Sequence, residues 1–130
     1  MPSSMLRTLA AAGIAAAALS ITPLAASAEG QSCFFSNQWQ GWKATPDASA
    51  MYIRVSNGVY RLDLTSPCTE LNSPGAYLIT NVRGSNSICS PLDIDMKVAT
   101  SPGFSSACLV RKMTRLSDAE RAALPKSLQP

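Results

Sequence analysis

The chain has 130 residues, a formal net charge of +3, four cysteines and no histidine. Histidine is the commonest acid–base side chain and metal ligand, so its absence leads us to assign neither a metal site nor a cofactor. The small net charge lacks the strongly basic character by which proteins bind nucleic acid, so we expect no nucleic-acid partner.

The N-terminal segment has the three parts of a signal peptide. Arg7 gives a positive region, Leu9 to Leu19 form an almost continuous apolar run, and Ala26-Ser27-Ala28 is a small-residue cleavage site. We therefore expect residues 1–28 to be cleaved. The mature chain would begin at Glu29 and lie in the periplasm or outside the cell.

The rest of the chain predicts one exported domain. Residues 29–124 have the length of a single domain, and no later apolar run reaches the roughly 18 residues of a membrane span. Cys33 follows Gly30-Gln31-Ser32, which lacks the apolar residue of a lipoprotein cleavage box, so we expect no lipid anchor. We expect a monomer, with residues 125–130 as a disordered tail.

Short alternating runs broken by Pro, Gly, Asn and Ser predict β-strands. The first strand is expected from Phe34 to Trp42, followed by a hairpin of residues 51–56 and 59–64. Asn57-Gly58 between these runs predicts a two-residue type I′ turn, in which both central residues have positive φ.

That turn implies a register for the hairpin. Ser56 would face Val59, Arg54 would face Arg61, and Tyr52 would face Asp63. One face of the hairpin is then apolar and the other polar, as in a half-buried sheet. The apolar face would hold Met51, Ile53, Val55, Tyr60, Leu62 and Leu64.

Three further strands are expected at residues 77–82, 92–98 and 108–113, although the apolar spacing over 108–116 also fits a helix. Ser117 and Glu120 form a capping box, which predicts a helix of about two turns ending before Pro125. The predicted fold is therefore mainly β. We expect a small antiparallel barrel or curled sheet of about five to six strands with one short C-terminal helix.

Four cysteines in an oxidising compartment predict two disulfides. We favour Cys33 with Cys108 and Cys68 with Cys89, because a small barrel places its first strand beside its last. The sequential pairing, Cys33 with Cys68 and Cys89 with Cys108, stays open. No Cys-x-x-Cys pair is present, which argues against a redox or zinc site.

Several motifs accompany the four cysteines. They are Cys33-Phe34, Tyr52-Ile53-Arg54-Val55, Val59-Tyr60-Arg61-Leu62, Cys68, Ile88-Cys89-x-x-Leu92-Asp93 and Cys108-x-Val110-x-Lys112-Met113-x-Arg115-Leu116-Ser117-x-x-Glu120. These motifs and the order of the cysteines resemble a family of small exported bacterial proteins known only as a domain of unknown function. The resemblance covers nearly the whole mature chain. It favours a strand over 108–116 and implies an envelope or secreted protein, but it brings no activity, ligand or catalytic residue.

Two groups of side chains are candidates for binding. Arg54 and Arg61 are predicted to lie opposite each other, so they need a neutralising partner such as Asp63, or they form an anion-binding patch with Tyr52. The aromatic cluster that includes Trp39 and Trp42 predicts core packing, with a ligand platform as the alternative. Five basic residues near the C-terminus predict a charged strand edge or attraction to anionic envelope surfaces. They are Arg111, Lys112, Arg115, Arg121 and Lys126.

The function that these patterns favour is a noncatalytic binding or structural module with an unknown envelope or extracellular partner. The first alternative is a small hydrolase that uses Asp93 and Asp95, although no nucleophile motif accompanies them. The second alternative is a secreted inhibitor of another enzyme. An inhibitor needs an exposed rigid loop, for which Ser101 to Ser106 is the candidate.

Overall fold

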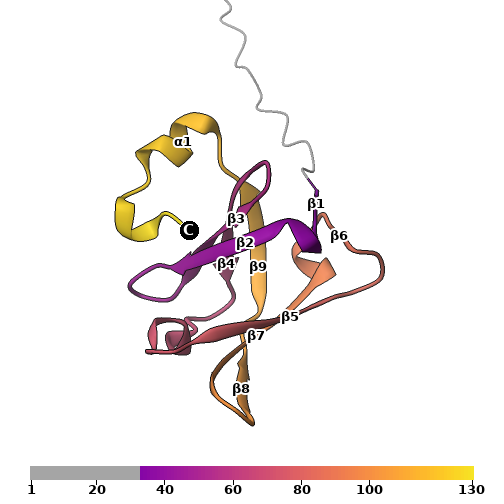
Figure 1. Ribbon diagram of the computed structural model, residues 1–130, viewed down its shortest axis with the longest axis vertical. Coiled ribbons are helices and arrows are strands. Elements are labelled where there is room, and N and C mark those ends of the chain that lie inside the picture. The colour runs from indigo at the N-terminus through magenta and orange to yellow at the C-terminus, as the bar shows by residue number, and fades with distance from the viewer. Residues whose placement is uncertain (1–32) are drawn as a thin grey trace, which may run out of the picture.

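Strands dominate residues 33–130, the part of the chain that the computed structural model describes (Figure 1). The predicted signal peptide, residues 1–28, lies outside this part. One α-helix, α1 (Asp118–Ala123), and four short 3-10 helices, η1 (Ser36–Gln38), η2 (Thr69–Asn72), η3 (Pro91–Asp93) and η4 (Lys126–Leu128), accompany the strands. The nine strands are β1 (Phe34–Phe35), β2 (Trp39–Ala44), β3 (Ala50–Val55), β4 (Gly58–Leu64), β5 (Tyr77–Val82), β6 (Ser87–Ile88), β7 (Ile94–Ser101), β8 (Phe104–Ala107) and β9 (Val110–Arg115).

The strands form three antiparallel sheets. A four-stranded sheet has the order β2-β3-β4-β9, a three-stranded sheet has the order β5-β7-β8, and β1 pairs with β6. The mainly β prediction is confirmed, but the described residues form nine strands where five to six were expected, and these make three open sheets and not a closed barrel. Closure requires the two edge strands of one sheet to pair with each other, and β2 and β9 do not do so within the described residues.

One hydrophobic core joins the sheets. Alternate residues of β3 and β4 point into it, as the predicted apolar face of the hairpin requires, and Ile94, Met96 and Val98 of β7 enter from the three-stranded sheet. Phe34 of β1 and Ile88 of β6 lie in the same core, each about 1% exposed. The core therefore holds together three sheets that share no strand.

The hairpin register differs from the prediction by two residues. Val55 lies opposite Gly58 and Tyr52 opposite Arg61, so Ser56 and Asn57 form the turn. Neither Asn57 nor Gly58 has positive φ, which rules out the predicted type I′ turn. Gly58 instead leaves room for Arg115, since a Cβ there would lie 3.3 Å from the Arg115 Nε. A shift of two keeps every side chain on its face, so the predicted faces are correct although the partners are not.

The other predicted strands are correct in part. The expected strand from Phe34 to Trp42 is broken by η1, whose Gln38 side chain accepts a hydrogen bond from the Phe35 N–H (2.9 Å). β5 has the predicted limits, and residues 110–115 form a strand and not a helix. The short strands β6 and β8 were not predicted, because neither is long enough to contain a period-two pattern.

The C-terminal segment folds back over the four-stranded sheet. α1 begins as predicted, with the Ser117 Oγ accepting from the Glu120 N–H (3.1 Å) and the Glu120 carboxylate accepting from the Ser117 N–H (2.7 Å). Residues 125–130, expected to be disordered, contain η4, and Pro130 lies near Gly41 of β2. We call residues 116–130 the C-terminal arm.

The disulfides join Cys33 to Cys89 and Cys68 to Cys108, so the favoured pairing and its sequential alternative are both wrong. The first bridge follows from strand pairing: Phe34 lies opposite Ile88, and the same register places Cys33 beside Cys89. The second follows from the pairing of β4 with β9, because Cys68 comes after β4 and Cys108 comes before β9. The barrel model failed here because β9 pairs with β4 and not with the first strand.

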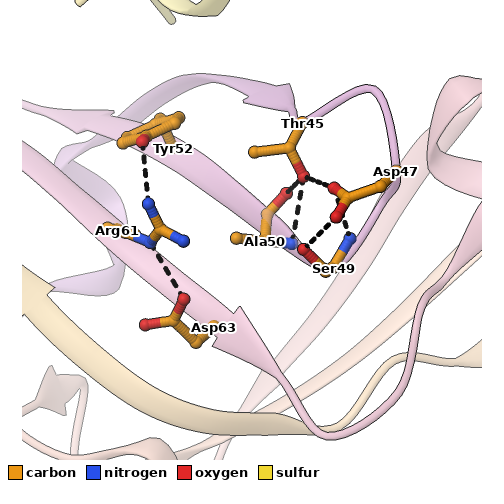
Figure 2. Close-up of polar contacts among 7 residues, drawn as sticks. All are labelled: Thr45, Asp47, Ser49, Ala50, Tyr52, Arg61 and Asp63. Atoms are coloured by element: carbon orange, nitrogen blue, oxygen red, sulfur yellow. Dashed lines mark hydrogen bonds and ion pairs between the residues drawn. The ribbon is translucent and has the colours of Figure 1, made fainter.

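The turn between β2 and β3 is built around Asp47 (Figure 2). Its carboxylate accepts hydrogen bonds from the hydroxyls of Thr45 (2.6 Å) and Ser49 (2.8 Å) and from the Ser49 N–H (3.2 Å). These donors hold the pKa of Asp47 at about 2, below its usual 3.8. Ala48 adopts positive φ (55°) in this turn and is almost fully buried.

Asp47 should make the free energy of unfolding depend on pH in the acidic range. Its pKa is lower in the folded chain than in the unfolded chain, so its contribution is complete above about pH 3.8 and is lost as the pH falls towards about 2. Asp47→Asn should remove this contribution, and the difference in unfolding free energy between the two proteins should shrink across that window. Urea unfolding at several pH values measures it. Asp118→Asn is the matched control, because it makes the same substitution at a carboxylate whose side chain is 99% exposed.

Candidate functional site

The outer face of the four-stranded sheet, away from the core, carries polar side chains in cross-strand rows. Lys43 of β2 lies opposite Tyr52 of β3, Tyr52 lies opposite Arg61 of β4, and Arg61 lies opposite Thr114 of β9. These residues share one face because side chains alternate along each strand. The C-terminal arm covers part of this face, and Tyr52 is only 7% exposed.

On this face, Arg61 lies between Tyr52 and Asp63 and contacts both (Figure 2). Its Nε donates to the Asp63 Oδ1 (2.9 Å) and its Nη1 donates to the Tyr52 hydroxyl (3.2 Å). The guanidinium carbon also lies 5.8 Å from the centre of the Tyr52 ring, within cation–π range. The hydrogen bond to Asp63 raises the pKa of Arg61, so the guanidinium is charged at every physiological pH.

A groove of about 470 Å³ runs between this face and the C-terminal arm. The arm supplies one wall because Glu120, Ala123 and Leu124 recur at helical spacing and so point the same way. The sheet supplies the floor. The residues that line the groove are Tyr52, Arg61, Asp63, Lys112, Thr114, Leu116, Glu120, Ala123 and Leu124.

The sheet residues predicted as an anion-binding patch only partly converge. Tyr52 and Arg61 are in contact in the groove, but Arg54 lies opposite Val59 and not opposite Arg61. Arg54 is exposed and does not line the groove. Asp63, considered as the partner that neutralises the two arginines, pairs with Arg61 on its own strand. The expected repulsion between directly opposed arginines is therefore absent from this hairpin.

The two tryptophans lie on the other side of the sheet. Trp42 is opposite Ile53 and Trp39 is opposite Val55, and both pack half-buried against the core. Phe34 contacts the Trp39 ring edge-on, with the ring centres 6.5 Å apart. The interpretation of this cluster as core packing is the one that the contacts support. Trp39 and Trp42 do not join Tyr52 and Arg61 in one site.

The two carboxylates named for a hydrolase, Asp93 and Asp95, have different surroundings. Asp93 ends η3, and its Oδ2 accepts from the backbone N–H groups of Cys89 (2.9 Å) and Ser90 (2.8 Å). These backbone donors lower the pKa of Asp93, which makes it a poor proton donor at neutral pH. Asp95 belongs to β7, where it lies opposite Asn81. Asp93 thus caps a turn beside the Cys33–Cys89 bridge.

The loop named for an inhibitor is the turn of the β7–β8 hairpin, at the lower end of the view in Figure 1. Gly103 has positive φ (86°) in the turn, and Phe104 is 77% exposed beside it. The Cys68–Cys108 bridge follows β8 directly and fixes the base of the hairpin. Single exposed apolar side chains are common on protein surfaces, so Phe104 alone does not define a binding site.

Among residues 33–130, no group of three or more acidic or cysteine side chains is placed to hold a metal ion. No helix there is both long enough and apolar enough to cross a membrane.

The chain was compared with family models, curated proteins and solved structures, and none of them matches it. The resemblance to an exported four-cysteine family therefore stays a prediction.

Sequence reasoning identified Tyr52 and Arg61 but not the wall of the groove. Lys112 was grouped with the basic residues near the C-terminus, Leu116 was considered only for the secondary structure and motif of the last strand, and Leu124 was not singled out. A local signal existed for Lys112, since it alternates with Thr114 along β9. The position of the C-terminal arm could not be predicted, because no local sequence pattern indicates which face of a sheet a short helix covers.

Proposed function

We propose that the protein is an exported, noncatalytic binding module whose ligand occupies the groove under the C-terminal arm. The observation that carries this proposal is the make-up of the groove. The fixed polar groups of Tyr52 and Arg61, together with the ammonium of Lys112, lie beside an apolar wall from the arm, and small-molecule sites combine these two features. The groove volume of about 470 Å³ lies within the range of such sites.

Two further observations support binding over catalysis. The Arg61 guanidinium is held by both Tyr52 and Asp63, so the floor of the groove needs little ordering when a ligand arrives. Of the two carboxylates considered for a hydrolase, Asp93 is held by backbone N–H groups in a capping role. The export part of the proposal rests on the N-terminal sequence and agrees with the two disulfides.

A fragment screen followed by backbone amide NMR tests the proposal on the oxidised mature protein. Fragments that bind should shift the amides of Thr114 and Leu116 in the groove. Ala123→Trp places an indole at the wall of the groove and should weaken these fragments by about tenfold or more, a loss near 1.4 kcal/mol.

Ala122→Trp is the matched control, because Ala122 is the adjacent residue of α1, is exposed and does not line the groove. Equal binding in both tryptophan variants would count against the groove as the site. So would fragments whose shifts map to another part of the molecule.

A further inference from the structure

We infer that the groove takes a small organic anion with an apolar body, with the anionic group at Lys112 and Arg61 and the body against Leu116 and Leu124. This inference rests on the proposed function, since it names the chemical class that the same groove would bind. It follows from which charged groups of the groove already have partners and which do not.

Each carboxylate of the groove already accepts a hydrogen bond through one of its oxygens. The Asp63 Oδ1 accepts from the Arg61 Nε at 2.9 Å, and the Glu120 Oε2 accepts from the Ser117 N–H at 2.7 Å. Asp63 is also mostly buried, with 19% of its side chain exposed. The Asp63 charge is thus already paired with Arg61, and a cation would have only the Asp63 Oδ2 and the Glu120 Oε1 left to contact.

The cations of the groove keep unused donors. The two hydrogen bonds of Arg61 engage Nε and Nη1, and neither uses Nη2. Within residues 33–130, the ammonium of Lys112 has no hydrogen bond or ion pair to a protein group, although Lys112 lies opposite Asp63 across the β4–β9 pair. One carboxylate, sulfonate or phosphate group could accept from both cations, and charge-assisted hydrogen bonds are the stronger ones.

The apolar part of the groove indicates that the rest of the ligand is apolar. Leu116, Ala123 and Leu124 form one wall, and the ring of Tyr52 lies in the floor. The available volume of about 470 Å³ suits a single small molecule. An inorganic anion would leave this wall in contact with water, whereas an anion with an apolar body would cover both parts of the site.

Two dyes with the same fluorescent group test the inference. The probes are 8-anilinonaphthalene-1-sulfonate, which carries the anion, and N-phenyl-1-naphthylamine, which lacks it. Lys112→Gln should raise the dissociation constant of the sulfonate about fivefold and leave that of the neutral dye unchanged. Ala123→Trp should weaken both dyes. Near-ultraviolet circular dichroism from the half-buried Trp39 and Trp42 verifies that each variant is folded.

Arg54→Gln is the matched control. It removes one positive charge from the same face of the sheet, but outside the groove. If Arg54→Gln weakens the sulfonate as much as Lys112→Gln does, the attraction is diffuse and the inference is overturned. If Ala123→Trp weakens both dyes while Lys112→Gln affects neither, the groove binds ligands without preferring anions. In that case the inference fails and the proposed function stands. If Ala123→Trp affects neither dye, both fail.

Discussion

Replacing Cys68 and Cys108 together with alanine should lower the free energy of unfolding by about 4 kcal/mol. The bridge closes a loop with a sequence separation of 40, and restricting a loop of that size in the unfolded chain is worth about this much. Both cysteines are also buried, at 4% and 2% exposed, so the variant loses packing as well. Thermal and urea unfolding under non-reducing conditions measure the change, which corresponds to a fall of roughly 15 °C or more in melting temperature.

The matched control replaces the other pair, Cys33 and Cys89. Its separation of 56 predicts a similar entropic loss, but Cys33 is exposed, so less packing is lost. We therefore expect the Cys68/Cys108 variant to be the less stable of the two. Non-reducing peptide mapping of the wild-type protein should find Cys33 linked to Cys89 and Cys68 linked to Cys108. Peptides that join Cys33 to Cys108 would contradict the fold as well as the stability argument.

Leu62→Ala should destabilise the protein by about 3 kcal/mol. Leu62 is fully buried in the middle of β4, opposite Met51 of β3 and Met113 of β9. Its truncation removes buried apolar surface and leaves a cavity in a core that strands from separate sheets must fill together. Urea unfolding should show a lower midpoint with an unchanged slope, since the folded state keeps its surface.

Leu92→Ala is the control for this substitution. It removes the same atoms from a side chain that is 78% exposed, so the free energy of unfolding should change by less than about 0.5 kcal/mol. If Leu62→Ala lowered the free energy of unfolding as little as Leu92→Ala does, Leu62 would not lie in the core described here. That result would also remove the basis for assigning inner and outer faces to β4.

In the β3–β4 hairpin, local sequence patterns predict the faces of the strands but not their register. Alternation of polar and apolar residues correctly placed Ile53 and Leu62 in the core and Arg61 on the other face, because the side-chain period of a strand is two whatever its partner. The register depended on a turn rule for Asn57-Gly58. That rule failed because Gly58 accommodates a neighbouring side chain, Arg115, from a strand far along the chain.

Long-range pairing could not be predicted from local patterns. The sequence indicated a strand near residues 110–115 but not that it adds to β4, and that pairing decides which cysteines meet. The groove depends on the same information. Tyr52 and Arg61 were identifiable from their shared face, whereas the wall formed by Leu124 exists only because the chain after β9 turns back across the sheet.

The pairing of β4 with β9 also has a consequence for how the chain acquires its native state. Leu64 lies opposite Val110, so the four-stranded sheet is completed only after most of the chain has been synthesised. Contacts between residues so distant in sequence slow folding, because loop-closure entropy is lost before the contacts form. Cys68 and Cys108 meet only when this pairing is in place, whereas thiols closer in sequence, such as Cys89 and Cys108, can collide earlier. We therefore expect oxidative refolding to pass through non-native bridges and to become faster when a thiol–disulfide isomerase is present.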